Sequence, residues 1–279
     1  MPGEPVHPLV HETVCEVTGQ EQRQNERTEP GDLYSAASGV ARIERMTRYH
    51  ALLLGVFAVV WMWAAIEPRY PHDWLLENYL VFVFVPLIVL TARYFRLSDL
   101  SYTLITAFML LHVVGSHYTY AEVPFGYTLQ HWFGSGRNMY DRLVHFCFGL
   151  LLAYPLHEVF VRVVKARGVW AYWFPLELVL AFSAGYEIIE WLVAARVDPA
   201  AGLAFLGAQG DVWDAQKDMA LAVAGAVPAL LMVALTHWRH DSAFGADLRA
   251  SLKIEPGDKP LGKQALREVR GKDGREDGD

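Results

Sequence analysis

The sequence lacks the patterns that define several large classes of protein. It has only two cysteines, Cys15 and Cys147, which excludes a disulfide framework or a zinc site of paired cysteines. It has no HExxH motif and no Ser, His and Asp in the order of a hydrolase triad. Its 31 acidic residues outnumber 24 basic ones, and no basic tract is present. Nucleic acid is therefore excluded as a partner.

Both ends of the chain are short of apolar residues. Residues 1–48 are rich in Glu, Gln, Thr and Pro, and residues 241–279 are rich in Lys, Arg, Asp, Glu and Gly. Neither end has an apolar period that could form a core, so we expect two mostly disordered tails. The first 48 residues also lack the basic and apolar segments of a cleavable signal, so we expect the first apolar run to act as a signal anchor.

The region between the tails, residues 49–240, is strongly apolar. The whole chain is 53% hydrophobic and 13% aromatic, and Trp and Tyr crowd the ends of the apolar runs, as at a membrane interface. Each run is close to the roughly 20 residues that a helix needs to cross a bilayer. The sequence therefore predicts an all-α fold, a polytopic membrane bundle of about six transmembrane helices. The six runs are residues 49–66, 78–93, 99–117, 143–163, 170–194 and 218–238.

Basic residues are distributed unevenly over the connections between these runs. They precede the first run, fill the short second and fourth connections, and follow the last run. The positive-inside rule then predicts a multi-pass protein of the bacterial cytoplasmic (inner) membrane with both termini in the cytoplasm. The residues concerned are Arg42, Arg45, Arg48, Arg93, Arg96, Arg162, Lys165, Arg167 and Arg239. Acidic and imidazole groups gather at the opposite ends of the runs, which predicts a polar site at the outer face.

Asp141 and His145 open the fourth run and are four residues apart, so they share one face of a helix. The carboxylate could orient the imidazole, or both could bind one metal ion. Alternatively, Asp141 caps the helix and His145 bonds to a neighbouring backbone group.

Three aspartates, Asp211, Asp214 and Asp218, are spaced along one stripe of a helix that leads into the sixth run. Carboxylates so close together repel each other and raise each other's pKa. A divalent cation, or Arg142 and Lys217 turned inward, would relieve that repulsion. For Asp211 and Asp214, a solvated first helical turn is the alternative interpretation.

Two further pairs close the fifth and third runs. Glu187 and Glu190 share a face near a helix C-terminus, where acids oppose the helix dipole. They could serve a metal or proton site, or Glu190 could be solvated. His112 and His117 are five residues apart and could serve one site only if the helix ended between them, which Gly115 would permit. Structural hydrogen bonding is the alternative for both imidazoles.

Four of these segments together resemble the YjdF-like family of bacterial inner-membrane proteins, over roughly residues 74–235. They are LHVVGSHYTY at 111–120, YDRLVHFCFG at 140–149, YEIIEW at 186–191 and QGDVWDAQKD at 209–218. The family has no established activity, so the resemblance implies a membrane location and no reaction. A looser similarity to the VanZ-like membrane proteins rests on the DRxxH segment from Asp141 and on the small residues after Asp218.

The leading hypothesis is a site at the outer leaflet for a small molecule or lipid headgroup, holding a divalent Zn, Mn or Mg ion. Its reaction would be metal-dependent hydrolysis or group transfer on a lipid or envelope precursor. The candidate catalytic residues are Asp141, His145, Glu187 and Asp218. The candidate metal ligands are His145, Glu187, Asp211, Asp214 and Asp218. Secondary candidates are His112, His117, Glu190, Arg142 and Lys217.

Two alternatives to this hypothesis remain open. In the first, the protein is a non-enzymatic transporter or an envelope-resistance binding protein, and the acids bind protons or a cationic substrate. In the second, the acids and bases pair with each other and only fix the helices in place. Membrane lipid is the expected partner in every case.

Overall fold

The computed structural model describes residues 47–197, 202, 205–254 and 262, and every regular element in these residues is helical. The chain divides into two compact units. One of them includes Leu87–Arg96, the end of a helix and the turn after it, where the Thr91 hydroxyl donates to the Leu87 carbonyl at 2.8 Å. The other unit, Thr47–Pro86 with Leu97–Asp279, is called the bundle below.

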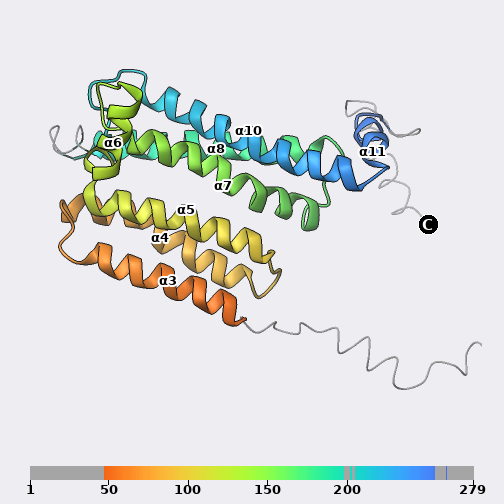
Figure 1. Cartoon of the computed structure of the whole chain (residues 1–279), viewed down its shortest axis with the longest axis horizontal. Helices are drawn as coiled ribbons and strands as arrows, with labels where there is room; N and C mark the ends of the chain where they lie inside the picture. Colours follow the sequence, from red (N-terminus) through yellow and green to blue (C-terminus); the bar gives the residue numbers. More distant parts are fainter. Residues whose placement is uncertain (1–46, 198–201, 203–204, 255–261, 263–279) are drawn as a thin grey trace, which may run out of the picture. The chain divides into compact units, whose positions relative to one another are not determined.

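Long helices form most of the described chain (Figure 1). They are α3 (Arg48–Ala65), α4 (Pro71–Thr91), α5 (Asp99–Tyr118), α7 (Tyr140–Arg162), α8 (Trp170–Ala194) and α10 (Asp214–His240). The shorter elements are η1 (Tyr120–Glu122), α6 (Pro124–Phe133) and α11 (Phe244–Ala250). Within the bundle α7 packs most extensively against α10 and also contacts α5 and α8, while α3 packs against α5. Helix α7 is therefore the central helix of the bundle.

Five of the described helices, α3, α4, α5, α7 and α10, are long and apolar enough to cross a membrane. The sixth predicted span, residues 170–194, forms the 25-residue helix α8 but is not among these five. Its length of about 37 Å is sufficient, but glutamates, tyrosines and tryptophans interrupt its apolar run. Helix α8 packs against both α7 and α10, so its polar groups face other helices as well as lipid. The chain is thus a polytopic helical membrane protein.

Three helices begin three or more residues earlier than the apolar runs predict. Helix α4 begins at Pro71 rather than at residue 78, α7 at Tyr140 rather than 143, and α10 at Asp214 rather than 218. The predicted starts were wrong because backbone hydrogen bonding continues past the point where the side chains become polar. One consequence is that Glu77, which the sequence placed in a connection, lies inside α4 and is buried.

Helices α7 and α10 approach each other at two glycines. A Cβ atom built on Gly149 would lie 1.8 Å from the carbonyl oxygen of Ala222, and one built on Gly225 would lie 1.9 Å from that of Phe146. Ala222 and Ala226 beside this contact are fully buried. Small residues allow membrane helices to bring their backbones together, and here they fix how the start of α10 faces the start of α7.

Near the C-terminal end of α7, the side chain of Glu158 caps the N-terminus of α5. Glu158 accepts hydrogen bonds from the Ser98 backbone N–H at 2.8 Å, the Ser98 hydroxyl at 2.8 Å and the Ser101 hydroxyl at 2.5 Å. It also pairs with Arg162. The first N–H groups of a helix have no partner within the helix itself, and the carboxylate compensates for this at the N-terminus of α5.

The two predicted tails lie largely outside the described residues, which begin at 47 and omit 255–261 and 263–279. In the described part after α10, the short helix α11 was not predicted. Ser251, which follows it, accepts a hydrogen bond from the Val169 N–H at 3.0 Å through its hydroxyl. Its carbonyl accepts from the Trp170 indole at 2.9 Å. Residues 244–251 therefore pack against the start of α8.

Candidate functional site

Arg142 is a buried cation in the first turn of α7. Its guanidinium donates to Asp214 Oδ1 at 2.5 Å and to Asp211 Oδ2 at 3.1 Å. The same group lies 2.7 Å from Asp218 Oδ1 and donates to the Asp214 carbonyl at 2.9 Å. One guanidinium thus joins α7 to Asp214 and Asp218 on α10 and to Asp211 in the loop before it. The prediction that all three aspartates lie on one helix was wrong for Asp211, because α10 begins only at Asp214. The inward position of Arg142 is one of the arrangements that the sequence offered for relieving their repulsion.

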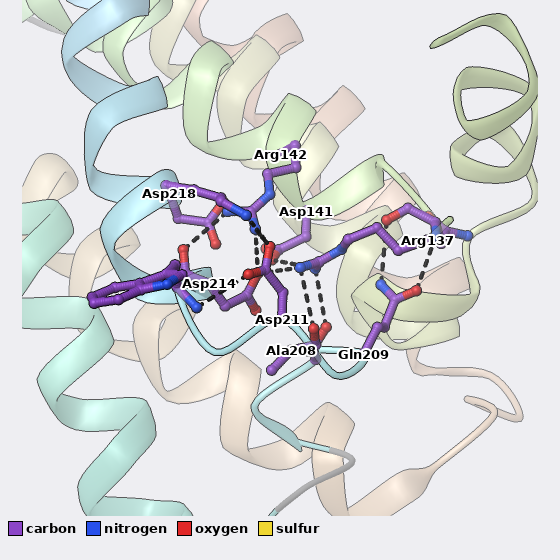
Figure 2. Close-up of polar contacts among 12 residues, drawn as sticks. Arg137, Asp141, Arg142, Ala208, Gln209, Asp211, Asp214 and Asp218 are labelled. Atoms are coloured by element: carbon purple, nitrogen blue, oxygen red, sulfur yellow. Dashed lines mark hydrogen bonds and ion pairs between the residues drawn. The ribbon is translucent and has the colours of Figure 1, made fainter. Parts of the chain in front are cut away.

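Arg137, in the connection before α7, is a second cation at this site, and Figure 2 shows both guanidinium groups directed at the carboxylates. It pairs with Asp214 and lies 3.6 Å from Asp141 Oδ2. It also donates to the carbonyls of Gly207 and Ala208 at 3.1 and 3.2 Å. Arg137 therefore fixes the loop before α10 as well as the charge of Asp214.

Lys217 completes the set of cations. Its ammonium group donates to Asp211 Oδ2 at 2.6 Å, and the Trp213 N–H donates to Asp211 Oδ1 at 3.1 Å. The hydrogen bond from Lys217 makes the largest contribution, and together the two hydrogen bonds hold the pKa of the Asp211 carboxyl below its usual range. Asp211 and Asp214, predicted as metal ligands, are thus both occupied by cationic side chains.

A different set of acids surrounds His145. Its Nε2 lies 3.6 Å from Asp141 Oδ1 on α7 and 3.5 Å from Glu187 Oε1 on α8. Ligand atoms of Asp141, His145 and Asp218 all lie within 4.8 Å of one another. The structure therefore brings together the four residues predicted as catalytic, from three different helices. Glu190 lies one turn beyond Glu187 and is half-buried.

The charges around His145 are not balanced by the cations described. With all five carboxyl groups ionised and His145 neutral, Asp141, Glu187, Asp211, Asp214 and Asp218 face three fixed positive charges, which leaves two negative charges. In addition, Glu187 Oε1 is buried and has no hydrogen-bond partner among the described residues, whereas Asp218 Oδ1 is paired with Arg142 at 2.7 Å. Buried carboxylate oxygens are normally hydrogen-bonded or paired. The arrangement can therefore accept an additional cation beside His145.

Glu77 and Tyr186 extend this polar region toward α4. The Tyr186 hydroxyl donates to Glu77 Oε2 at 2.6 Å, and the Tyr186 ring lies 6.4 Å from the His145 ring, centroid to centroid. Glu77 is 6% exposed. Glu77 was not among the predicted site residues because it precedes the second apolar run. The available signal was Pro71, which suits the first position of a helix and would have placed Glu77 within its first turns.

Both ring nitrogens of His112 lie within hydrogen-bonding distance of other groups of the bundle. Its Nε2 is 3.2 Å from the Glu77 carbonyl, which can only accept, so Nε2 is the donor and Nδ1 is the acceptor from the Tyr120 hydroxyl at 2.6 Å. Burial raises the pKa of the Tyr120 hydroxyl well above its usual range, which keeps it a donor. Gly115 permits this contact, because a Cβ there would lie 2.8 Å from the Tyr120 ring.

His117 also lies apart from the cluster. Helix α5 continues to Tyr118 instead of ending at Gly115, so the two histidines are on different faces. The His117 and Trp63 rings are tilted relative to each other, with their centroids 4.6 Å apart, and His117 Nδ1 lies 3.1 Å from the Ala64 carbonyl. A site shared by His112 and His117 is therefore not formed.

The loop before α10 is held by residues to which the sequence assigned no role. Gln209 accepts from the Asn138 N–H at 2.9 Å and donates to the Asn138 carbonyl at 3.2 Å. Together with Arg137, this pairing fixes residues 207–211 against the connection before α7. The four-residue spacing of Arg137 and Asp141 was the one signal in the sequence that could have indicated their ion pair.

Residues 49–239 match the family described as predicted membrane protein (DUF2238). The chain belongs to this family. The DUF2238 match covers nearly all of the long helices and every residue of the cluster around His145. The chain is also 43% identical over 178 residues to the inner membrane protein YjdF of Escherichia coli (strain K12), which is 62% of this chain and 85% of that protein. No solved structure matches the chain.

These comparisons confirm the resemblance drawn from the four sequence segments. Membership of DUF2238, the inner-membrane relative and the apolar helices together establish a multi-pass protein of the inner membrane. Neither the family description nor the relative's name states an activity. The looser similarity to the VanZ-like proteins stays a prediction.

Proposed function

We propose that Asp141, His145, Glu187 and Asp218 bind one divalent cation and that the site uses it for hydrolysis or group transfer on a lipid or envelope precursor. The spacing around His145 Nε2 is the main support. Its distances of 3.5 and 3.6 Å to two carboxylate oxygens exceed those of a direct hydrogen bond. Ligand atoms about 2.0–2.2 Å from a tetrahedral zinc ion lie roughly 3.3–3.6 Å apart.

The ligand types also suit a divalent ion. One imidazole with several carboxylates is a ligand set of zinc and manganese, while magnesium prefers oxygen ligands alone. Two unmatched negative charges equal the charge of one such ion. When bound, it would polarise a phosphoryl or carbonyl group or acidify a water molecule. Arg142 would orient Asp218, and Glu187 is placed to complete the ligand set or to accept a proton.

The orientation proposed is that both termini are cytoplasmic and that the site faces the other side of the membrane. Basic residues lie at the start of α3, in the connections α4–α5 and α7–α8, and at the end of α10. The cluster lies at the starts of α7 and α10 and near the end of α8. The positive-inside rule then places the cluster at the outer leaflet, where lipid headgroups and envelope precursors are accessible.

Metal analysis of the purified full chain tests the cation. We expect about one equivalent of zinc or manganese per chain, and a higher Tm when either ion is added to chelator-treated protein. Asp218→Asn should lose the bound ion and the Tm increase. Asp247→Asn, an exposed acid beyond α10, is the matched control and should keep both. Wild-type protein that is metal-free, and whose Tm ignores zinc, manganese and magnesium, would refute the site.

A second experiment tests the chemistry. The chain is reconstituted in vesicles of an inner-membrane lipid extract, and lipid species are followed by mass spectrometry with the preferred ion or with chelator. We expect ion-dependent consumption of one lipid or lipid-linked species by the wild type and none by Asp218→Asn. A metal-bound wild type that changes no lipid would refute group transfer on these lipids while retaining the cation site.

A further inference from the structure

Helix α6 and its surroundings are the most exposed aromatic region near the candidate site. Phe125, Trp132 and Phe133 are 48%, 68% and 72% exposed. Phe125 and Trp132 are seven residues apart, so they share one helical face, and their ring centroids are 6.4 Å apart. Contiguous exposed apolar surface of this kind marks an interaction site.

The position of α6 in the chain indicates what covers this face. The helix lies in the connection between α5 and α7, both of which can cross a membrane, so it lies at a membrane surface. Its ten residues span about 15 Å, half of the hydrocarbon thickness, so α6 cannot itself cross. Trp and Tyr side chains are favoured at the boundary between headgroups and acyl chains.

The composition of α6 points to an uncharged contact. Its sequence, PFGYTLQHWF, contains no Asp, Glu, Lys or Arg, whereas a helix on a water-exposed surface normally has charged residues opposite its apolar face. Attraction to anionic headgroups therefore supplies little of the contact, which depends on burial of the aromatic rings.

We infer that α6 is an interfacial helix, with Phe125, Trp132 and Phe133 inserted at the headgroup–acyl boundary of the leaflet on the side of the His145 cluster. The inner face of α6 is fixed tightly enough to hold it there. Gly126 lies against Asn138, because a Cβ on Gly126 would be 1.8 Å from Asn138 Oδ1, and the Met139 N–H donates to the Gly126 carbonyl at 3.2 Å. Leu129 is buried on the same side.

The contact between α6 and Asn138 links the depth of α6 in the membrane to the depth of the candidate site. Asn138, which contacts α6, also exchanges two hydrogen bonds with Gln209 in the loop before α10. The loop ends at the aspartates that Arg142 binds. The aromatic face of α6 therefore sets the start of α10 at headgroup level. The inference holds whether or not a cation binds beside His145.

The test places a single environment-sensitive nitrobenzoxadiazole label on each face of α6. Trp132→Cys reports the aromatic face and His131→Cys the polar one, both in a full-length chain with Cys15→Ser and Cys147→Ala. In phosphatidylcholine nanodiscs we expect the label at 132 to be quenched by lipid with a shallow doxyl group and to be at least fivefold less accessible to iodide than the label at 131. Replacing a third of the lipid by phosphatidylglycerol should not change this difference.

A second pair keeps the test decisive if Trp132→Cys does not fold. Phe125→Cys shares the face of Trp132, whereas His131→Cys lies on a different face of the helix. Both positions are exposed, and the label at 125 should be the protected one. Equal iodide access at both members of a pair would overturn the inference. Protection at 132 without doxyl quenching, which persists in detergent and requires dimers, would assign the face to a second copy of the chain and would also overturn it.

Discussion

The contact between the α7 and α10 backbones predicts that one added methyl group disrupts the candidate site. In Gly225→Ala the new Cβ would lie 1.9 Å from the Phe146 carbonyl oxygen and 2.8 Å from the Leu150 nitrogen. The first distance is roughly 1.5 Å short of an ordinary contact. Both atoms belong to the backbone of a helix, so no rotamer change can relieve the overlap. The two helices must therefore separate.

The energetic effect follows from that separation. Alanine is intrinsically a better helix former than glycine by about 1 kcal/mol, and overpacking costs typically 1–3 kcal/mol and sometimes more. Asp218 lies seven residues before Gly225, on the same face of α10, so a shift of this size would also break its 2.7 Å contact with Arg142. We expect a net loss of about 2 kcal/mol or more, which lowers Tm by roughly 5 °C.

The assay compares thermal unfolding of detergent-solubilised Gly225→Ala and Gly55→Ala with the wild type. Gly55 on α3 has no atom within 4 Å of a built Cβ, so the same substitution there should leave Tm unchanged or raise it slightly. Gly149→Ala, whose Cβ would meet the Ala222 carbonyl, should behave like Gly225→Ala. The reasoning is refuted if Gly225→Ala is as stable as Gly55→Ala.

Three other predictions concern different parts of the molecule. Glu158→Ala should lower Tm by several degrees, because it leaves buried donors at the start of α5 without an acceptor (about 1–3 kcal/mol), whereas Glu177→Ala at an exposed position should not. Because the pKa of Asp211 is lowered in the fold, its contribution to stability is complete above about pH 4 and is lost as the pH falls through the folded value. The Tm difference between wild type and Asp211→Asn should therefore shrink from pH 6 to pH 3. Reporter fusions after Gly134 and after Gly168 should report opposite sides of the membrane.

Each of these has a result that contradicts it. Equal Tm losses for Glu158→Ala and Glu177→Ala would show that the cap contributes nothing. A Tm difference for Asp211→Asn that grows toward acid pH would mean that the carboxyl is favoured in its protonated form. A cytoplasmic signal from the fusion after Gly134 would invert the proposed orientation.

The sequence predicts the helices well because apolar runs of membrane-crossing length have few alternatives in lipid. It predicts their ends poorly, because α4 and α10 continue through polar residues such as Glu77 and Asp214. Spacing alone places Asp141 beside His145 and aligns the aspartates of α10. The Asp141 and His145 pair faces the aspartates of α10 because Gly149 approaches Ala222. These two residues are more than seventy positions apart in the chain, so spacing cannot predict their contact.

The cationic residues of the site also show that the sequence predicts local contacts better than long-range ones. Arg142 and Lys217 were candidates because they stand next to acids in the sequence. Arg137 was not, because its contacts with Gly207 and Ala208 depend on how a loop folds. Only its ion pair with Asp141 has a local signal, the four-residue spacing; its contacts with the loop before α10 have none.

The long-range pairing of Arg142 also constrains the order of biosynthesis. Helix α7 leaves the ribosome before α10 has been synthesised, so its guanidinium reaches the translocation machinery before Asp211, Asp214 and Asp218 exist to receive it. An uncompensated arginine is costly within the hydrocarbon, so the first turn of α7 has to stay hydrated at the membrane surface during this interval. Completion of α10 then locks both helices at once. A nascent chain that stops before residue 211 would present the Arg142 charge without any of these three carboxylates to neutralise it.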